Sequence, residues 1–169
     1  DGNPNPQWDQ LMANLKRKPF PAQRERVQAV CQLLLAADQS AAVLNGEMGT
    51  GKTMMGIAAA AVMYPYGYRR TLVIAPPHLV YKWRREILET IGDAKVWVLN
   101  GPDTLRQLLK IRAQQDSIGR AQPEFFILGR VRMRMGFDWQ PAIKERRVYE
   151  QMDLDHEDNG KRSILVHRY

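Results

Sequence analysis

One stretch of eight residues constrains this chain more than any other part of it. Residues 46–53 are GEMGTGKT, which matches the pattern G-x-x-x-x-G-K-[ST] at every fixed position. The preceding run SAAVLN is typical of a short buried strand, and the following run KTMMGIAAAAVMY is rich in good helix formers. A glycine-rich turn between a strand and a helix is the context in which this pattern binds phosphate. The sequence therefore predicts a phosphate-binding loop.

Each residue type in the loop suits that task. Glycines let the backbone turn sharply, so that successive N–H groups and the helix N-terminus can present positive potential to a di- or triphosphate. Lys52 is expected to reach the β- and γ-phosphates and carry charge for catalysis, and the Thr53 hydroxyl to bind Mg²⁺. A glycine-rich turn with an ordinary surface lysine is the alternative. The predicted nucleotide-binding residues in this loop are Gly46, Glu47, Met48, Gly49, Thr50, Gly51, Lys52 and Thr53.

Strand and helix patterns alternate along the rest of the chain. Apolar runs typical of buried strands are TLVIA, KVWVL and EFFIL, and amphipathic or helix-forming runs separate them. This alternation predicts an α/β fold of three layers with a mostly parallel, incomplete sheet. We expect a flexible lead-in over residues 1–18, an ATP-binding domain over 19–148 and a polar segment over 149–169, where SILVHRY is a further candidate strand.

Composition excludes several classes of protein. The single cysteine, Cys31, allows neither an intramolecular disulfide nor a cysteine-cluster zinc site, and no apolar run is long enough to span a membrane. A reducing, cytoplasmic location is the expectation. The net charge is +7, with most of the excess beyond residue 68. Such a basic half is either a solvated face or a surface for a polyanion.

Three segments in order carry a resemblance to a known family. PFPAQRERVQAVCQLL, LNGEMGTGKT and TLVIAPPHLVYKWRREI resemble the opening of the first RecA-like domain of superfamily-two (DEAD/DEAH-type) helicases, and look most like the Swi/Snf branch of DNA translocases. The similarity is clear from Pro19 to Ile87 and weaker to Gly136. It implies a RecA-like fold, ATP with Mg²⁺ as cofactor, and an ATP-dependent helicase or translocase.

The resemblance also implies roles for residues outside the loop. Gln23 would read the adenine edge, because an amide can donate and accept at once. His78 and Lys82 would contact the nucleic-acid backbone, whereas Trp83 is expected in the core. The implied partners are double-stranded DNA and a second RecA-like domain. Further phosphate contacts, with a solvated basic face as the alternative, are expected from Arg130, Arg132 and Arg134.

Hydrolysis in this family uses a later Asp-Glu-x-His motif, which we do not find in the chain. The nearest match, DLDH at residues 153–156, has Leu154 at the Glu position and is interpreted as a solvated acidic turn. We therefore expect weak ATP binding without turnover by the chain alone. Two alternatives stay open: a stand-alone nucleotide-binding protein, such as a kinase or loader-type ATPase, or a nucleic-acid-binding module with a vestigial nucleotide site.

Overall fold

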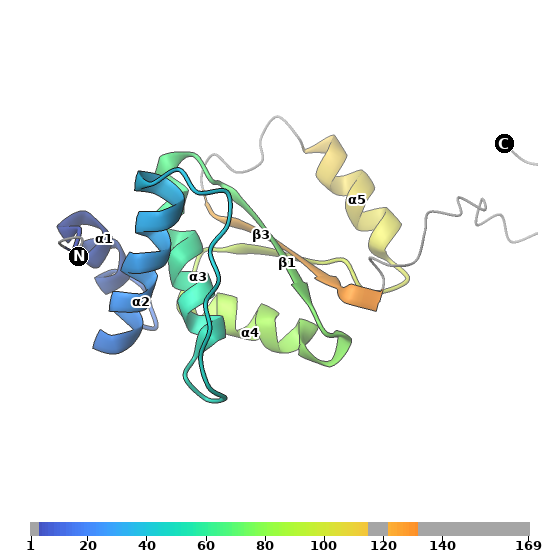
Figure 1. Cartoon of the computed structure of the whole chain (residues 1–169). Coiled ribbons are helices and arrows are strands. Elements are labelled where there is room, and N and C mark those ends of the chain that lie inside the picture. Colours follow the sequence, from blue (N-terminus) through green and yellow to red (C-terminus); the bar gives the residue numbers. More distant parts are fainter. Residues whose placement is uncertain (1–3, 115–121, 132–169) are drawn as a thin grey trace, which may run out of the picture. The chain divides into compact units, whose positions relative to one another are not determined.

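The computed structural model describes residues 4–114 and 122–131 of the chain. The chain divides into the units Asp1–Met135 and Gly136–Tyr169, and all elements described below lie in the first. These elements are labelled in Figure 1 where there is room. In chain order they are α1 (Pro6–Ala13), α2 (Pro21–Cys31), the π-helical turn η1 (Gln32–Ala36), α3 (Lys52–Met63), the 3₁₀ turn η2 (Tyr64–Tyr66), β1 (Arg70–Ala75), the 3₁₀ turn η3 (Pro77–Leu79), α4 (Val80–Thr90), β2 (Lys95–Val98), α5 (Thr104–Ala113) and β3 (Glu124–Gly129).

The three strands form one parallel sheet in the order β1-β3-β2. The connection from β1 to β2 through α4 and the connection from β2 to β3 through α5 therefore run in opposite directions across the sheet. Right-handed crossovers then require the two helices to lie on opposite faces. Figure 1 shows this arrangement, with the strands between α4 and α5. The predicted α/β fold with a parallel, incomplete sheet is confirmed.

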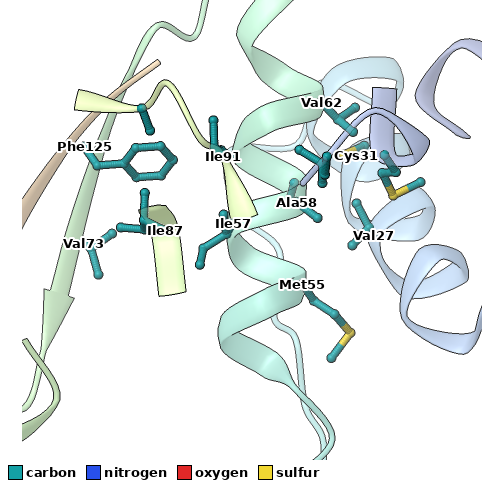
Figure 2. Close-up of a cluster of buried hydrophobic side chains, with 14 of the residues drawn as sticks. Val27, Cys31, Met55, Ile57, Ala58, Val62, Val73, Ile87, Ile91 and Phe125 are labelled. Carbon is teal, nitrogen blue, oxygen red and sulfur yellow. The ribbon is translucent and has the colours of Figure 1, made fainter. Parts of the chain in front are cut away.

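Helix α3 lies at the centre of the core. Its sequence is apolar on nearly all sides, as expected for a helix buried between other elements. Ile57 is directed toward the cluster of Ile87 and Phe125, on the sheet side, whereas Ala58 lies on the side of Val27 in α2 (Figure 2). The covered side of the sheet therefore carries two successive helical layers, the first of α3 and α4 and the second of α1 and α2.

The segment expected to be a flexible lead-in contains a packed helix. Asn5 caps α1, since its Oδ1 accepts a hydrogen bond from the Gln7 N–H at 2.9 Å, and Pro6 occupies the first turn. Trp8 and Met12, one turn apart, are buried, and the Trp8 indole donates to the Tyr66 hydroxyl at 2.9 Å. Helix α1 therefore replaces a flexible lead-in over Pro6–Ala13. The apolar residues Trp8, Leu11, Met12 and Leu15 follow helical spacing, so the sequence carried a signal for this helix.

The run SAAVLN does not form the strand predicted before the glycine loop. Residues 41–47 belong to neither a helix nor a strand, and the Val43 side chain is 90% exposed. A strand needs a neighbour for its backbone N–H and C=O groups, and no strand of the described ranges pairs with this run. Apolar composition alone was therefore insufficient. The predicted strand SILVHRY and the polar segment 149–169 lie outside the described residues.

No helix in the part of the chain that the structure describes is long and apolar enough to cross a membrane.

Candidate functional site

The glycine loop makes a sharp turn at the N-terminus of α3. Gly49 has a φ of +88° and Gly51, which caps α3, has a φ of +81°. Both angles lie in the left-handed region, where a side chain with a Cβ atom is strained. The Met48 side chain, directly before Gly49, is 97% exposed. The two glycines thus place Lys52 and Thr53 in the first turn of α3, as the pattern predicts.

The Lys52 ammonium lies over the loop itself. Its Nζ donates to the carbonyl oxygens of Gly46, at 2.8 Å, and Glu47, at 2.7 Å. The Thr50 hydroxyl donates to the same Glu47 carbonyl at 2.9 Å. Lys52 and residues 46–50 of the loop are exposed, so phosphate oxygens could replace the carbonyls as acceptors. The arrangement therefore offers a cation, at the end of a helix, to an anionic ligand.

Thr53 fits the metal-binding role expected of it. The residue is half-buried in the first turn of α3, and within the described ranges its hydroxyl makes no hydrogen bond. A free hydroxyl oxygen beside a phosphate site is a suitable ligand for Mg²⁺, which prefers oxygen. Among the described residues there is no cluster of three or more His, Cys, Asp or Glu side chains that could hold a metal by itself. A magnesium ion held by Thr53 would therefore take most of its other ligands from the phosphates of the nucleotide.

Gln23 in α2 is in direct contact with the loop. Its Nε2 donates to the Thr50 carbonyl at 3.0 Å, and its Oε1 accepts from the Phe20 N–H at 3.0 Å. The residues are 27 positions apart in the sequence. The structure thus brings Gln23 and the glycine loop together, as a shared nucleotide site requires.

The residues expected to contact nucleic acid follow the ends of the strands. Ala75 of β1 is paired with Gly129 of β3, so that the segments leaving these strands start side by side at one edge of the sheet. His78, in the turn after β1, and Arg130, directly after β3, are both exposed. They therefore lie at the same edge, where parallel sheets commonly bind ligands.

Of the other residues singled out in the sequence, the structure describes Lys82 and Trp83. Lys82 lies in the first turn of α4; its side chain is exposed and forms an ion pair at 3.8 Å with the half-buried Glu86. Trp83 packs against the hydrophobic core, beside Gly56 of α3, in agreement with its expected core position. Arg132 and Arg134 lie outside the described residues.

Sequence reasoning missed Asn100 at this edge. A Cβ atom on Gly129 would collide with the Asn100 Oδ1, so glycine at residue 129 leaves room for the amide in this position. Asn100 follows β2, whose end also lies at this edge because the Leu99 N–H donates to the Ile127 carbonyl at 2.8 Å. The signal available in the sequence was the polar pair Asn100-Gly101 directly after the apolar run KVWVL.

A cavity of about 780 Å³ lies along α2 on the side of α1, away from the glycine loop. Its wall includes Arg24, whose Nε is buried without a hydrogen-bond partner in the described part of the chain, together with the acidic Asp9 and Glu25. No residue of 46–53 lines it. Because this wall carries both acidic and basic side chains, it does not favour a phosphate. The loop is the better candidate, since its backbone N–H groups and the Lys52 ammonium all present positive charge.

The fold and the loop together define an α/β protein with a phosphate-binding loop at the N-terminus of a helix next to a parallel sheet. A family model makes the assignment narrower: the SNF2-related domain matches residues 11–121. The chain belongs to the SNF2-related domain family, a Swi/Snf-like family of superfamily-two helicases with a RecA-like fold. The resemblance found in the sequence is confirmed. No curated protein matches the chain significantly.

Proposed function

We propose that this chain binds ATP with Mg²⁺ and serves as the nucleotide-binding part of an ATP-dependent nucleic-acid translocase or helicase. The observation that carries the proposal is the position of Lys52. Its ammonium is held over the loop by the carbonyls of Gly46 and Glu47, at the N-terminus of α3. A triphosphate would find there a cation and the free N–H groups of a helix start.

In this proposal the residues have separate roles. The loop Gly46–Thr53 holds the phosphates, Lys52 carries charge to the β- and γ-phosphates, and Thr53 holds Mg²⁺, which neutralises phosphate charge when bound. Gln23 meets the adenine edge with the part of its amide that Phe20 and Thr50 leave free. We assign this domain to residues 19–148, with α1 packed on it.

The second half of the proposal is contact with nucleic acid, specifically with the phosphates of double-stranded DNA. His78 and Arg130 support it because both are exposed and follow strands that end side by side. Lys82 adds a cation one turn into α4. Arg132 and Arg134 continue the same basic run in the sequence. A second RecA-like domain would complete the motor.

Nucleotide binding tests the first half. We expect calorimetric titration to detect Mg-ATP binding in preference to Mg-GTP, and Lys52→Ala to weaken ATP affinity at least tenfold, the effect of losing one charged hydrogen bond. Lys110→Ala, which removes an exposed cation from α5, is the matched control and should leave the affinity unchanged. Absence of ATP binding by the wild type would favour the vestigial-site alternative. Steady-state ATPase activity of the chain that Lys52→Ala abolishes would contradict the expectation of no turnover.

Salt-dependent DNA binding tests the second half. Fluorescence anisotropy with a labelled duplex should show affinity that falls steeply with salt, because bound phosphates release counterions. Arg130→Ala should weaken binding to all sequences alike and reduce the salt slope by about 1. Arg26→Ala, an exposed arginine on α2, should leave the slope unchanged. ATP binding without any polynucleotide binding would favour a stand-alone nucleotide-binding protein.

A further inference from the structure

The Gln23 side chain spans the gap between α2 and the glycine loop. Its Oε1 accepts a hydrogen bond from the Phe20 N–H, which precedes the helix, and its Nε2 donates to the Thr50 carbonyl within the loop. Both ends of the amide are thus engaged by protein. Figure 1 shows α2 lying beside the loop that leads into α3. Gln23 therefore contacts the loop directly, in addition to any contact with a base.

The loop backbone comes unusually close to this side chain. A Cβ atom on Gly51 would collide with the Gln23 Nε2, so that a larger residue would force this amide to move. Gly51 also has a φ of +81°. The left-handed backbone favours glycine at residue 51, and glycine also leaves the Gln23 amide room to reach the Thr50 carbonyl.

The hydrogen bond to Thr50 determines the direction of the next N–H group. The peptide between Thr50 and Gly51 is planar and trans, so that its C=O and N–H point in opposite directions. Because the Thr50 carbonyl points toward Gln23, the Gly51 N–H points away from it. Within the described ranges this N–H donates no hydrogen bond. It is a free, oriented donor in the loop expected to hold phosphate.

A chain of contacts joins Gln23 to Lys52. Gln23 holds the carbonyl of Thr50, the hydroxyl of Thr50 donates to the Glu47 carbonyl, and that carbonyl also accepts from the Lys52 Nζ. Each link is 3.0 Å or shorter. Without the Gln23 contact, the Gly51 N–H would therefore be less firmly oriented, and so would the Glu47 carbonyl that accepts from Lys52.

We infer that Gln23 is a positioning residue for the phosphate loop, and that it contributes to triphosphate affinity independently of the base. The inference rests on the proposed function, since it concerns the same site. An amide has two N–H groups and two acceptor lone pairs, and the protein uses one of each. Gln23 can therefore orient Gly51 and still present one donor and one acceptor to adenine.

A ligand without a base separates the two roles. Wild type and Gln23→Met are titrated calorimetrically with Mg-ATP and with inorganic Mg-tripolyphosphate. Methionine is unbranched, of similar length and uncharged, so that the substitution removes hydrogen bonds without adding repulsion. We expect tripolyphosphate to bind roughly tenfold more weakly to Gln23→Met, and ATP to lose at least as much affinity because it also loses the adenine contact. Gln10→Met, at an exposed position on α1, is the control and should bind both ligands as the wild type does.

A second variant leaves the base-reading amide in place. Phe20 has a φ of −65° and its side chain is 72% exposed, so Phe20→Pro removes the N–H that holds Gln23 at little other cost. It should weaken tripolyphosphate binding in the same direction as Gln23→Met, by a smaller factor. In ¹H–¹⁵N spectra the Gly51 amide should shift with tripolyphosphate in the wild type and less in both variants. An unchanged Trp8 indole resonance would show that the fold is intact.

The outcomes are distinct. Weakening of tripolyphosphate as well as ATP, with the fold intact, supports the inference. If Gln23→Met weakens ATP alone, or neither ligand, the inference is overturned while the proposed function stands. If the wild type binds neither ATP nor tripolyphosphate, the proposed function fails and the inference fails with it.

Discussion

The two faces of the sheet differ sharply in what covers them. On one face, Val73 and Phe125 lie beside Ile87 of α4 and toward Ile57 of α3, and Phe125 is only 1% exposed (Figure 2). Ile127 is buried in the same cluster. On the other face, Leu72 of β1 is 59% exposed and Ile74 is also exposed. Neighbouring residues of one strand thus differ completely in environment, because successive side chains of a strand point to opposite faces.

The difference shows where the stability of the described part of the chain resides. Parallel sheets are normally covered on both faces. Here α5 is the described helix on the second face, and none of its residues is buried. Its apolar residues Leu105, Leu108 and Leu109 are exposed. The side that carries the glycine loop and α3 is therefore the well-packed one, and substitutions should distinguish the two faces.

The largest expected effect compares one residue from each face. Phe125→Ala should lower the free energy of unfolding by about 3–5 kcal/mol, because it leaves a cavity in a packed core. Leu72→Ala on the other face should cost less than about 1 kcal/mol, since the side chain is already largely in water. Urea denaturation followed by circular dichroism measures both. Equal losses would contradict the proposed asymmetry between the faces.

A smaller effect is expected at the polar cluster of the second face. The Glu124 carboxylate is buried; its Oε1 accepts from the Trp97 indole at 2.9 Å, and Arg70 and Lys95 lie at 3.6 and 3.8 Å. Glu124→Gln should cost about 1–3 kcal/mol, because it removes a charged partner from both cations while keeping an acceptor for Trp97.

The control for that change is an exposed pair elsewhere. Glu89→Gln on α4 removes the ion pair with Arg85, which is exposed at both ends, and should cost less than about 0.5 kcal/mol. The same urea measurement at low and high salt applies, since the cost at the buried Glu124 should change less with salt. Similar costs for both substitutions would show that the cluster does not anchor this face.

The last effect appears only at alkaline pH and tests the second helical layer on the covered side. Burial raises the pKa of the Cys31 thiol from 9.0 to about 11. The folded protein therefore keeps a proton that the unfolded chain loses, and the Cys31 contribution to stability is full below pH 9. It should decline as pH rises from about 9 to 11, by at most about 1.4 kcal/mol per pH unit. Cys31→Ala removes this dependence; an identical alkaline slope in both proteins would argue against burial of the thiol.

Prediction from sequence succeeded where the pattern is local. The glycine loop, the start of α3 at Lys52 and the three strands of the sheet all follow from short runs of residues with strong preferences. It failed for SAAVLN, because strand formation needs a partner that composition does not reveal. It also missed α1, although Trp8, Leu11, Met12 and Leu15 follow helical spacing, and packing against α2 and α3 accounts for their burial.

The candidate site shows the same division. Its residue types and their spacing in 46–53 could be predicted, since the pattern is contiguous. The Gln23–Thr50 hydrogen bond could not, because it joins residues 27 positions apart through the packing of α2 on α3. Asn100 was missed because its approach to Gly129 depends on which strand lies in the middle of the sheet.

By itself the sequence determined the phosphate-loop motif, the alternation of strands and helices, and membership of the SNF2-related family. These properties depend on backbone preferences and side-chain chemistry within short segments. The tertiary structure decided which face of the sheet is covered, what holds the loop, and which strand ends share an edge. Those depend on the order β1-β3-β2 and on helix packing, which bring together residues that no local pattern connects.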